Sequence, residues 1–270
     1  MKANFQKLLS KSKIIMATLP NFFYVKKLHA REDILELQTL KKTGFVRYKN
    51  IISDEECVKI SNLIDELINK KKISFIEKQK IWKLSSVDDF INITEEILNF
   101  KNISDLISDY FKKEFFLSDF DIRRVEPADH NEISKMGQSN SDWHKDIRGK
   151  QLKLMIYITD VNEYDNHFSI IPQSQFKRVY DFNSSRFLDE NINTKNQIKI
   201  LGKKGTGILF DTNVIHRLNR LKSSKVRDTI TLNFTPGQYL KKIYFSDQNK
   251  LEGRKIHKKI INNSLFFKRD

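Results

Sequence analysis

Two short segments carry side chains that together could hold a metal ion. His144 and Asp146 form a His-x-Asp pair with one residue between them, and His216 stands alone further along the chain. Two imidazoles and one carboxylate can occupy one face of an Fe(II) ion and leave the other face open for a co-substrate and dioxygen. Arg227, eleven positions after His216, offers a guanidinium fork for a dicarboxylate co-substrate. The pattern predicts an Fe(II) centre with an adjacent carboxylate anchor.

Strand geometry explains the spacing of the first pair. Alternate side chains of a strand point the same way, so we expect His144 and Asp146 to face one side and Lys145 the other. His216 follows a glycine turn and an apolar run at residues 205–215, so it must come from a different strand. The two strands become neighbours only after folding.

A second half-buried strand is predicted to follow His216. Residues 217–224 are polar and indicate a loop, whereas polar and apolar side chains alternate from Thr229 to Phe234. Such alternation is typical of a strand with one buried face. The side chains predicted to share the face toward a polar cavity are Arg227, Thr229, Thr231 and Asn233.

Four segments occur in a characteristic order between residues 40 and 236. They are residues 43–56, the His144-Lys145-Asp146 motif, residues 160–175, and residues 205–227. In these segments the chain resembles the phytanoyl-CoA dioxygenase family, a branch of the Fe(II)/2-oxoglutarate oxygenases. The resemblance covers most of the chain.

The resemblance implies a role for each residue of the pattern. His144, Asp146 and His216 would bind iron, and Arg227 would pair with the distal carboxylate of 2-oxoglutarate, helped by Thr229. Dioxygen would be consumed, 2-oxoglutarate would yield succinate and CO2, and a substrate carbon would be hydroxylated. Halogenating relatives lack the carboxylate ligand, so the presence of Asp146 favours hydroxylation.

The chain departs from the family pattern in its loops. His167 follows Asn166 where the family usually has glycine, and Gln173-Ser174-Gln175 follows Pro172. Leu218 stands where some members place a small hydroxyl residue beside the co-substrate. These changes leave the substrate and the full set of co-substrate contacts open.

The charges near the motifs suggest a small anionic metabolite as the substrate. The alternative for each of these residues is a loop position with no role in binding. A non-catalytic binding or scaffold protein, or an oxygenase that acts on a macromolecule, are the other functions to weigh. The candidate substrate residues are Arg148, His167, Arg217 and Arg220.

Composition agrees with one compact enzyme. The chain has 270 residues, is 39% hydrophobic and carries a formal net charge of +15. Lysine far outnumbers arginine and basic residues are not interleaved with aromatics, so no nucleic-acid partner is expected. The apolar run at residues 14–19 is too short for a membrane span. With Cys57 as the single cysteine, no internal disulfide can form, which favours the cytoplasm.

The predicted fold is mainly β with flanking helices around a double-stranded β-helix, a jelly-roll or cupin-like core. We expect one oxygenase domain over residues 1–270. Residues 1–114 form its mostly helical lead-in, 115–240 its jelly roll and 241–270 a basic extension. Residues 53–56 predict a helix start, and residues 91–110 are helical in pattern. Strands are expected at 43–48, 115–122, 152–159, 168–171, 197–201, 207–210 and 228–235, and residues 178–194 are expected to form a lid.

Overall fold

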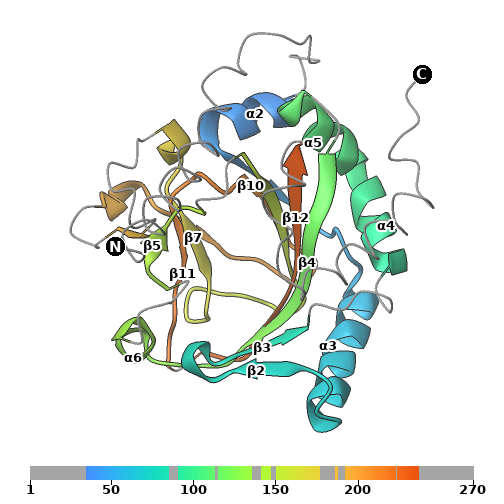
Figure 1. Ribbon diagram of the computed structural model, residues 1–270, viewed down its shortest axis with the longest axis vertical. Helices are drawn as coiled ribbons and strands as arrows, with labels where there is room; N and C mark the ends of the chain where they lie inside the picture. The colour runs from blue at the N-terminus through green and yellow to red at the C-terminus, as the bar shows by residue number, and fades with distance from the viewer. Residues whose placement is uncertain are drawn as a thin grey trace, which may run out of the picture.

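Two antiparallel sheets face each other in the computed structural model, which describes residues 35–84, 91–112, 115–135, 141–146, 150–176, 186–187, 192–222 and 224–236. The larger sheet has the strand order β1-β10-β6-β12-β4-β3-β2, and the smaller has β8-β5-β11-β7-β9. Helices α2 to α5 lie along the outer side of the larger sheet (Figure 1). This arrangement confirms the predicted jelly roll with flanking helices.

The strands of the larger sheet are β1 (Phe45–Tyr48), β2 (Ser74–Ile76), β3 (Ile81–Leu84), β4 (Phe115–Val125), β6 (Leu152–Tyr157), β10 (Gly207–Asp211) and β12 (Arg227–Pro236). Those of the smaller sheet are β5 (Trp143–His144), β7 (Phe168–Ile170), β8 (Arg186–Phe187), β9 (Ile198–Ile200) and β11 (His216–Leu218). The helices are α2 (Leu35–Thr43), α3 (Asp54–Asn69), α4 (Ile91–Asn99), α5 (Ile103–Phe111) and α6 (His130–Lys135). Short 3-10 turns cover Glu77–Gln79, Phe100–Asn102, Ser174–Phe176 and Thr194–Asn196.

Helix α3 begins where the sequence predicts. The Ser53 hydroxyl accepts a hydrogen bond from the backbone N–H of Glu56, which satisfies one of the unpaired amides of the first turn. Cys57, Ile60 and Ile64 recur at helical spacing and are all buried in the main core. The helix therefore packs its apolar stripe on the sheet.

The single helical region predicted at residues 91–110 is divided in two. Lys101 adopts φ 45° and ψ 34°, a left-handed conformation that a continuous α-helix does not admit. The chain turns there, and α4 and α5 both contribute to the core, as Ile97 and Ile107 are fully buried.

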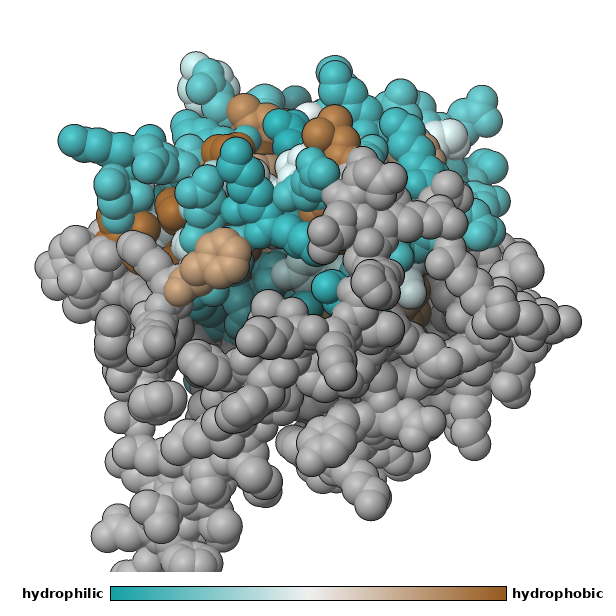
Figure 2. Space-filling model, turned by 90° about the horizontal axis from the view of Figure 1, so that it is seen from above, coloured by the Kyte–Doolittle hydropathy of each residue, from teal (hydrophilic) through white to brown (hydrophobic). Residues whose placement is uncertain are grey.

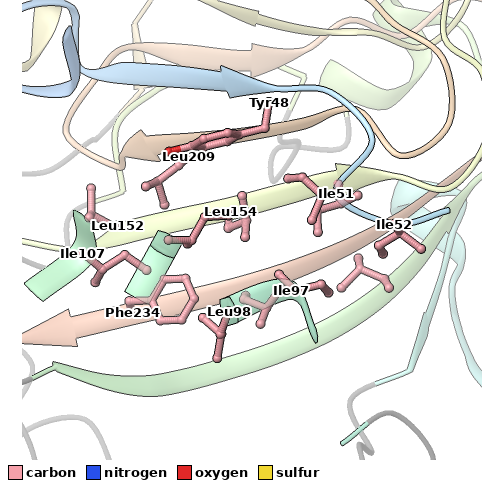
Figure 3. Packing of buried hydrophobic residues seen from close by; sticks show 14 of the residues in the cluster. Tyr48, Ile51, Ile52, Ile97, Leu98, Ile107, Leu152, Leu154, Leu209 and Phe234 are labelled. Atoms are coloured by element: carbon pink, nitrogen blue, oxygen red, sulfur yellow. The ribbon is translucent and has the colours of Figure 1, made fainter. Parts of the chain in front are cut away.

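The two faces of the larger sheet differ in chemistry. On β12 the outward side chains Ile230, Leu232 and Phe234 are fully buried in the core beneath the helices. Figure 3 shows Phe234 and Leu154 of the sheet packed with Ile97 and other helix residues. Burying one such aliphatic or aromatic side chain contributes roughly 1.5–3 kcal/mol, so this layer holds the sheet to its helices. The inward face carries the predicted row of Arg227, Thr229, Thr231 and Asn233, all buried.

Several elements were not expected from the sequence. β2 and β3 extend the larger sheet beyond β4, and β11 occupies the start of the predicted polar loop at 217–224. These strands have three or four residues, too few to show a clear alternation. β1, β2 and β3 all come before residue 115. The part of the chain expected to be mostly helical therefore also contributes strands to the larger sheet.

Some of the predicted segments lie outside the residues that the structure describes. The termini at 1–34 and 237–270 lie outside the described residues, as does most of the expected lid at 178–194. In the described part, no helix combines the length and the apolar character needed to cross a membrane. The face in Figure 2 is largely hydrophilic where it is coloured, with small separate hydrophobic patches.

A buried ion pair ties α3 to the outer face of the larger sheet. Asp228 is fully buried and accepts hydrogen bonds from Arg124 Nε and Nη2, each at 2.8 Å. The Ser61 hydroxyl of α3 donates to the same carboxylate at 2.8 Å, and Asp65 also pairs with Arg124. The ion pairs of Arg124 with Asp228 and Asp65 thus link β4, β12 and α3.

Replacing Asp228 with alanine should lower the free energy of unfolding by about 3 kcal/mol, because a buried guanidinium loses its main partner. Urea denaturation monitored by circular dichroism measures the change. Asp160→Ala is the control, since Asp160 pairs with the exposed Lys203 at the surface, and its unfolding midpoint should hardly move. Equal midpoints for both variants would contradict the assigned role of Asp228.

Candidate metal centre

The two predicted histidine ligands lie directly opposite each other on neighbouring strands. β5 and β11 pair antiparallel with His144 against His216, and the ring centroids are 4.3 Å apart. Side chains opposite each other in such a pair point to the same face. The His216 ring also lies 5.2 Å from the ring of Phe210, which belongs to the larger sheet. Both imidazoles therefore project into the space between the sheets.

Asp146 completes the cluster from just beyond the end of β5. We expected a strand through Asp146, but β5 stops at His144, and the Asp146 N–H instead donates to the Thr212 carbonyl at 3.0 Å. Asp146 Oδ1 then lies 3.7 Å from His144 Nε2 and 3.9 Å from His216 Nε2. One donor atom from each residue lies within 4.8 Å of the others. The structure thus brings the three predicted ligands together.

Backbone carbonyls set the proton positions on both rings. His144 Nδ1 lies 2.7 Å from the Asp142 carbonyl, and His216 Nδ1 lies 2.7 Å from the Val214 carbonyl. A carbonyl can only accept, so each Nδ1 carries the hydrogen and each neutral Nε2 keeps a lone pair. The Nε2 atoms are the ones nearest Asp146. Metal-binding histidines are usually oriented in this way, so the residues present fit a divalent metal ion.

The electrostatics of the cluster favour the same protonation states. Burial, followed by the neighbouring His144, lowers the pKa of His216 to about 3, so this imidazole is neutral at physiological pH. Burial by itself would raise the pKa of Asp146, but the ammonium of Lys153 and the nearby imidazoles outweigh it and hold that pKa well below its ordinary value. A neutral imidazole and an ionised carboxylate are the forms that bind metals.

Ser174 forms hydrogen bonds with both of the segments that carry the predicted metal ligands. The buried Lys145, which points away from the triad, donates from Nζ to the Ser174 carbonyl at 2.7 Å. The Ser174 hydroxyl accepts from the N–H of Ile215, the residue before His216, at 2.7 Å, and donates to the Ile171 carbonyl at 2.6 Å. The loop that departs from the family pattern therefore retains a structural serine.

Arg227 is a buried cation with unused hydrogen-bonding capacity. Its side chain is 5% exposed, and its Nη1 donates to the Asn166 carbonyl at 3.0 Å. Its Nε has no acceptor, and no carboxylate of the described residues forms an ion pair with it. Burial lowers the pKa of this guanidinium. A buried charge without a carboxylate partner is costly, so this position suits an incoming anion. Thr229 lies two residues on and faces the same way.

The candidate substrate residues are placed differently from the triad. Arg217 lies on the opposite face of β11 from His216, with its guanidinium 4.4 Å from the ring centre of Trp143. Arg220 is buried and donates to the Gln79 and Glu126 carbonyls, at 3.1 and 2.7 Å, which fastens two loops. His167 is buried with Nδ1 against the Asp165 carbonyl and is not among the clustered donors. Arg148 lies outside the described residues.

Several charged residues of the inner wall, the face of the larger sheet that is turned toward the smaller one, were not predicted from the sequence. Lys153 reaches Asp146 Oδ2 at 2.7 Å. Asp121, fully buried on β4, pairs with Arg123 through two hydrogen bonds of 2.6 and 2.7 Å and lies 3.4 Å from Lys83. The signal for Lys153 was a lysine at an inward position of the otherwise apolar segment Leu152–Tyr157. The pairing of Asp121 needed the register of β3 and β4, which the sequence does not show.

Comparison with solved structures shows that the fold is shared with known proteins. Solved structures with the same fold include the epimerase SnoN in complex with Fe3+, alpha ketoglutarate and nogalamycin RO, at 9% identity and a TM-score of 0.57, covering 74% of this chain and 82% of that one. EctD from S. alaskensis, with 2-oxoglutarate and 5-hydroxyectoine, has 14% identity, a TM-score of 0.57 and coverage of 78% and 80%. The carbocyclase SnoK from nogalamycin biosynthesis has 14% identity, a TM-score of 0.54 and coverage of 77% and 86%.

Sequence comparison decides the family. No curated protein sequence matches this chain. A sequence profile described as Phytanoyl-CoA dioxygenase (PhyH) matches residues 40–229, well over half of the chain. The match spans the His-x-Asp pair, the second histidine and Arg227, and it confirms the resemblance seen in the sequence. The chain belongs to the phytanoyl-CoA dioxygenase family.

Proposed function

We propose that this protein is an Fe(II)- and 2-oxoglutarate-dependent dioxygenase that hydroxylates a small anionic metabolite. Iron would be held by His144, Asp146 and His216. The observation that carries the proposal is their convergence, with two Nε2 lone pairs and one carboxylate oxygen within 4.8 Å of one another. Two histidines and one carboxylate are the ligand set of non-haem Fe(II) oxygenases. When bound, iron with 2-oxoglutarate and dioxygen supplies the oxidation, which releases succinate and CO2.

Arg227 would hold the distal carboxylate of 2-oxoglutarate. Its guanidinium is buried, has an unpartnered Nε and lies on the inner face of β12. Thr229 shares that face and offers a hydroxyl two residues away. An ion pair at a buried position, shielded from solvent, is stronger and more directional than one at the surface. The protein's contribution is thus to fix the co-substrate's orientation relative to the triad.

The apolar surroundings of the triad would limit access of water. His216 packs against the rings of Phe168 and Phe210, with centroids 5.4 and 5.2 Å from its own, and those two rings contact each other at 5.0 Å. Both phenylalanines are buried, so this pair gives the imidazole an apolar neighbour. Exclusion of solvent strengthens electrostatic contacts within the site and suppresses side reactions.

Two cations of the inner wall support an anionic substrate. Arg123 and Lys83 both approach Asp121, yet their side chains remain 25% and 28% exposed. Unlike Arg217 and Arg220, which are engaged elsewhere, these two lie in the rows of the larger sheet that face the smaller one. A phosphate or carboxylate group reaching this wall would find cationic partners.

Succinate release tests the proposal. The purified protein, supplied anaerobically with Fe(II) and then with 2-oxoglutarate and air, should form succinate, and a panel of phosphorylated, sugar-acid and acyl-carrier-linked compounds should stimulate it. Mass spectrometry of the consumed compound distinguishes a product heavier by one oxygen from an epimer or a cyclised product. Failure to bind iron or to turn over 2-oxoglutarate would favour a binding or scaffold protein.

Asp146→Ala should weaken Fe(II) binding and abolish succinate formation, because the triad loses its one anionic ligand. Calorimetric titration of the metal-free protein and a succinate assay measure the two effects. Asp160→Ala, which removes a surface carboxylate, is the matched control and should leave both unchanged. Full turnover by Asp146→Ala would remove Asp146 from the ligand set.

Arg227→Met should raise KM for 2-oxoglutarate at least about thirtyfold, the equivalent of about 2 kcal/mol for a lost buried charge pair. Iron affinity should stay unchanged, since Arg227 is not one of the clustered donors. Arg217→Met, on the outer face of β11, is the control for loss of an arginine. An unchanged KM in Arg227→Met would place the carboxylate anchor elsewhere.

A further inference from the structure

Lys153 is the one inner-wall side chain of the described residues that forms an ion pair with Asp146. It lies on β6, in register with Phe210 of β10 and Asn233 of β12. Its Nζ is 2.7 Å from Asp146 Oδ2 and 5.9 Å from the centre of the Phe210 ring. The ammonium contacts Oδ2, whereas the carboxylate oxygen nearest the two histidine Nε2 atoms is Oδ1.

The two oxygens of Asp146 therefore have different partners. Oδ1 faces both histidine Nε2 atoms, at 3.7 and 3.9 Å, while Oδ2 accepts from Lys153. A carboxylate can bind a cation through one oxygen or through both. Because the ammonium engages Oδ2 and Oδ1 is the oxygen nearest both histidines, Oδ1 is the better placed of the two for a shared ion. The backbone bond from Asp146 N–H to the Thr212 carbonyl fixes the residue at its other end.

We propose that Lys153 is a positioning residue that holds Asp146 as a single-oxygen metal ligand. The inference rests on the proposed function, because it assigns a task within the same metal site. A ligand that contributes one oxygen instead of two leaves one more coordination position open for the co-substrate and dioxygen. Lys153 would thus preserve the open face of the ion by acting on the carboxylate.

The charge and the hydrogen bond of Lys153 act in opposite directions. Its positive charge repels a metal cation, so removing a lysine that served only as a charge would tighten metal binding. Its hydrogen bond orients the ligand, and loss of such an outer-shell partner typically weakens metal affinity 10–100-fold. The sign of the change in affinity therefore separates the two roles.

The test is a titration of the metal-free protein with Mn(II), followed by the electron paramagnetic resonance signal of the free ion. Lys153→Met keeps the length and apolar stem of the side chain but removes the donor, and we expect affinity to fall about tenfold. Lys153→Arg restores a cationic donor and should recover most of the loss. Lys199→Met, at an exposed position of β9, is the control and should match the wild type. Circular dichroism and thermal melts show that each variant is folded.

The outcomes are distinct. Mn(II) affinity that is equal or higher in folded Lys153→Met would overturn the positioning role, as would a variant in which only KM for 2-oxoglutarate changes. If Lys153→Met does not fold, Lys153→Arg decides, because a tenfold loss despite its charge and donors also contradicts the proposal. Wild-type protein that binds no Mn(II) would instead refute the proposed function on which the inference rests.

Discussion

The pairing of His144 with His216 is the contact on which the rest of the site depends. β5 and β11 have two and three residues, and their register places one imidazole directly opposite the other. Such short strands carry few ladder hydrogen bonds of their own. The Lys145–Ser174–Ile215 bonds and the Asp146–Thr212 bond supply the missing constraint. The geometry of the triad is thus set by backbone pairing and secured by a few buried polar contacts.

The two faces of the larger sheet carry different kinds of side chain. Its outer face is apolar and carries the stabilising contacts with α3, α4 and α5. Its inner face holds Lys153, Arg227, Thr229 and the Asp121–Arg123 pair, polar and charged groups that are costly to bury without partners. Alternation along β12 achieves this separation within a single strand. The outer face therefore provides the apolar packing, and the inner face carries the polar and charged side chains.

Most of this arrangement was predictable from the sequence. The alternation along β12 placed Arg227 and Thr229 on one inward face, and the His-x-Asp spacing with a later histidine predicted the cluster that the structure shows. The contacts that the sequence did not reveal depend on how the strands pair. The stacking of Arg217 on Trp143, the loop contacts of Arg220 and the reach of Lys153 to Asp146 all require the strand register. Very short strands such as β5 and β11 leave no periodic signal from which that register could be read.

The three clustered donors come from two segments, the His144–Asp146 pair and His216, which are distant along the chain and meet only across the β5–β11 ladder. In an unfolded chain His216 is separated from the His144–Asp146 pair, and a cation has no set of three donors to bind. An ion that needs all three therefore recognises the native state alone, and its binding free energy adds to the stability of the fold. The concentration of free metal ion would then affect the fraction of the protein that is folded as well as the fraction that is active.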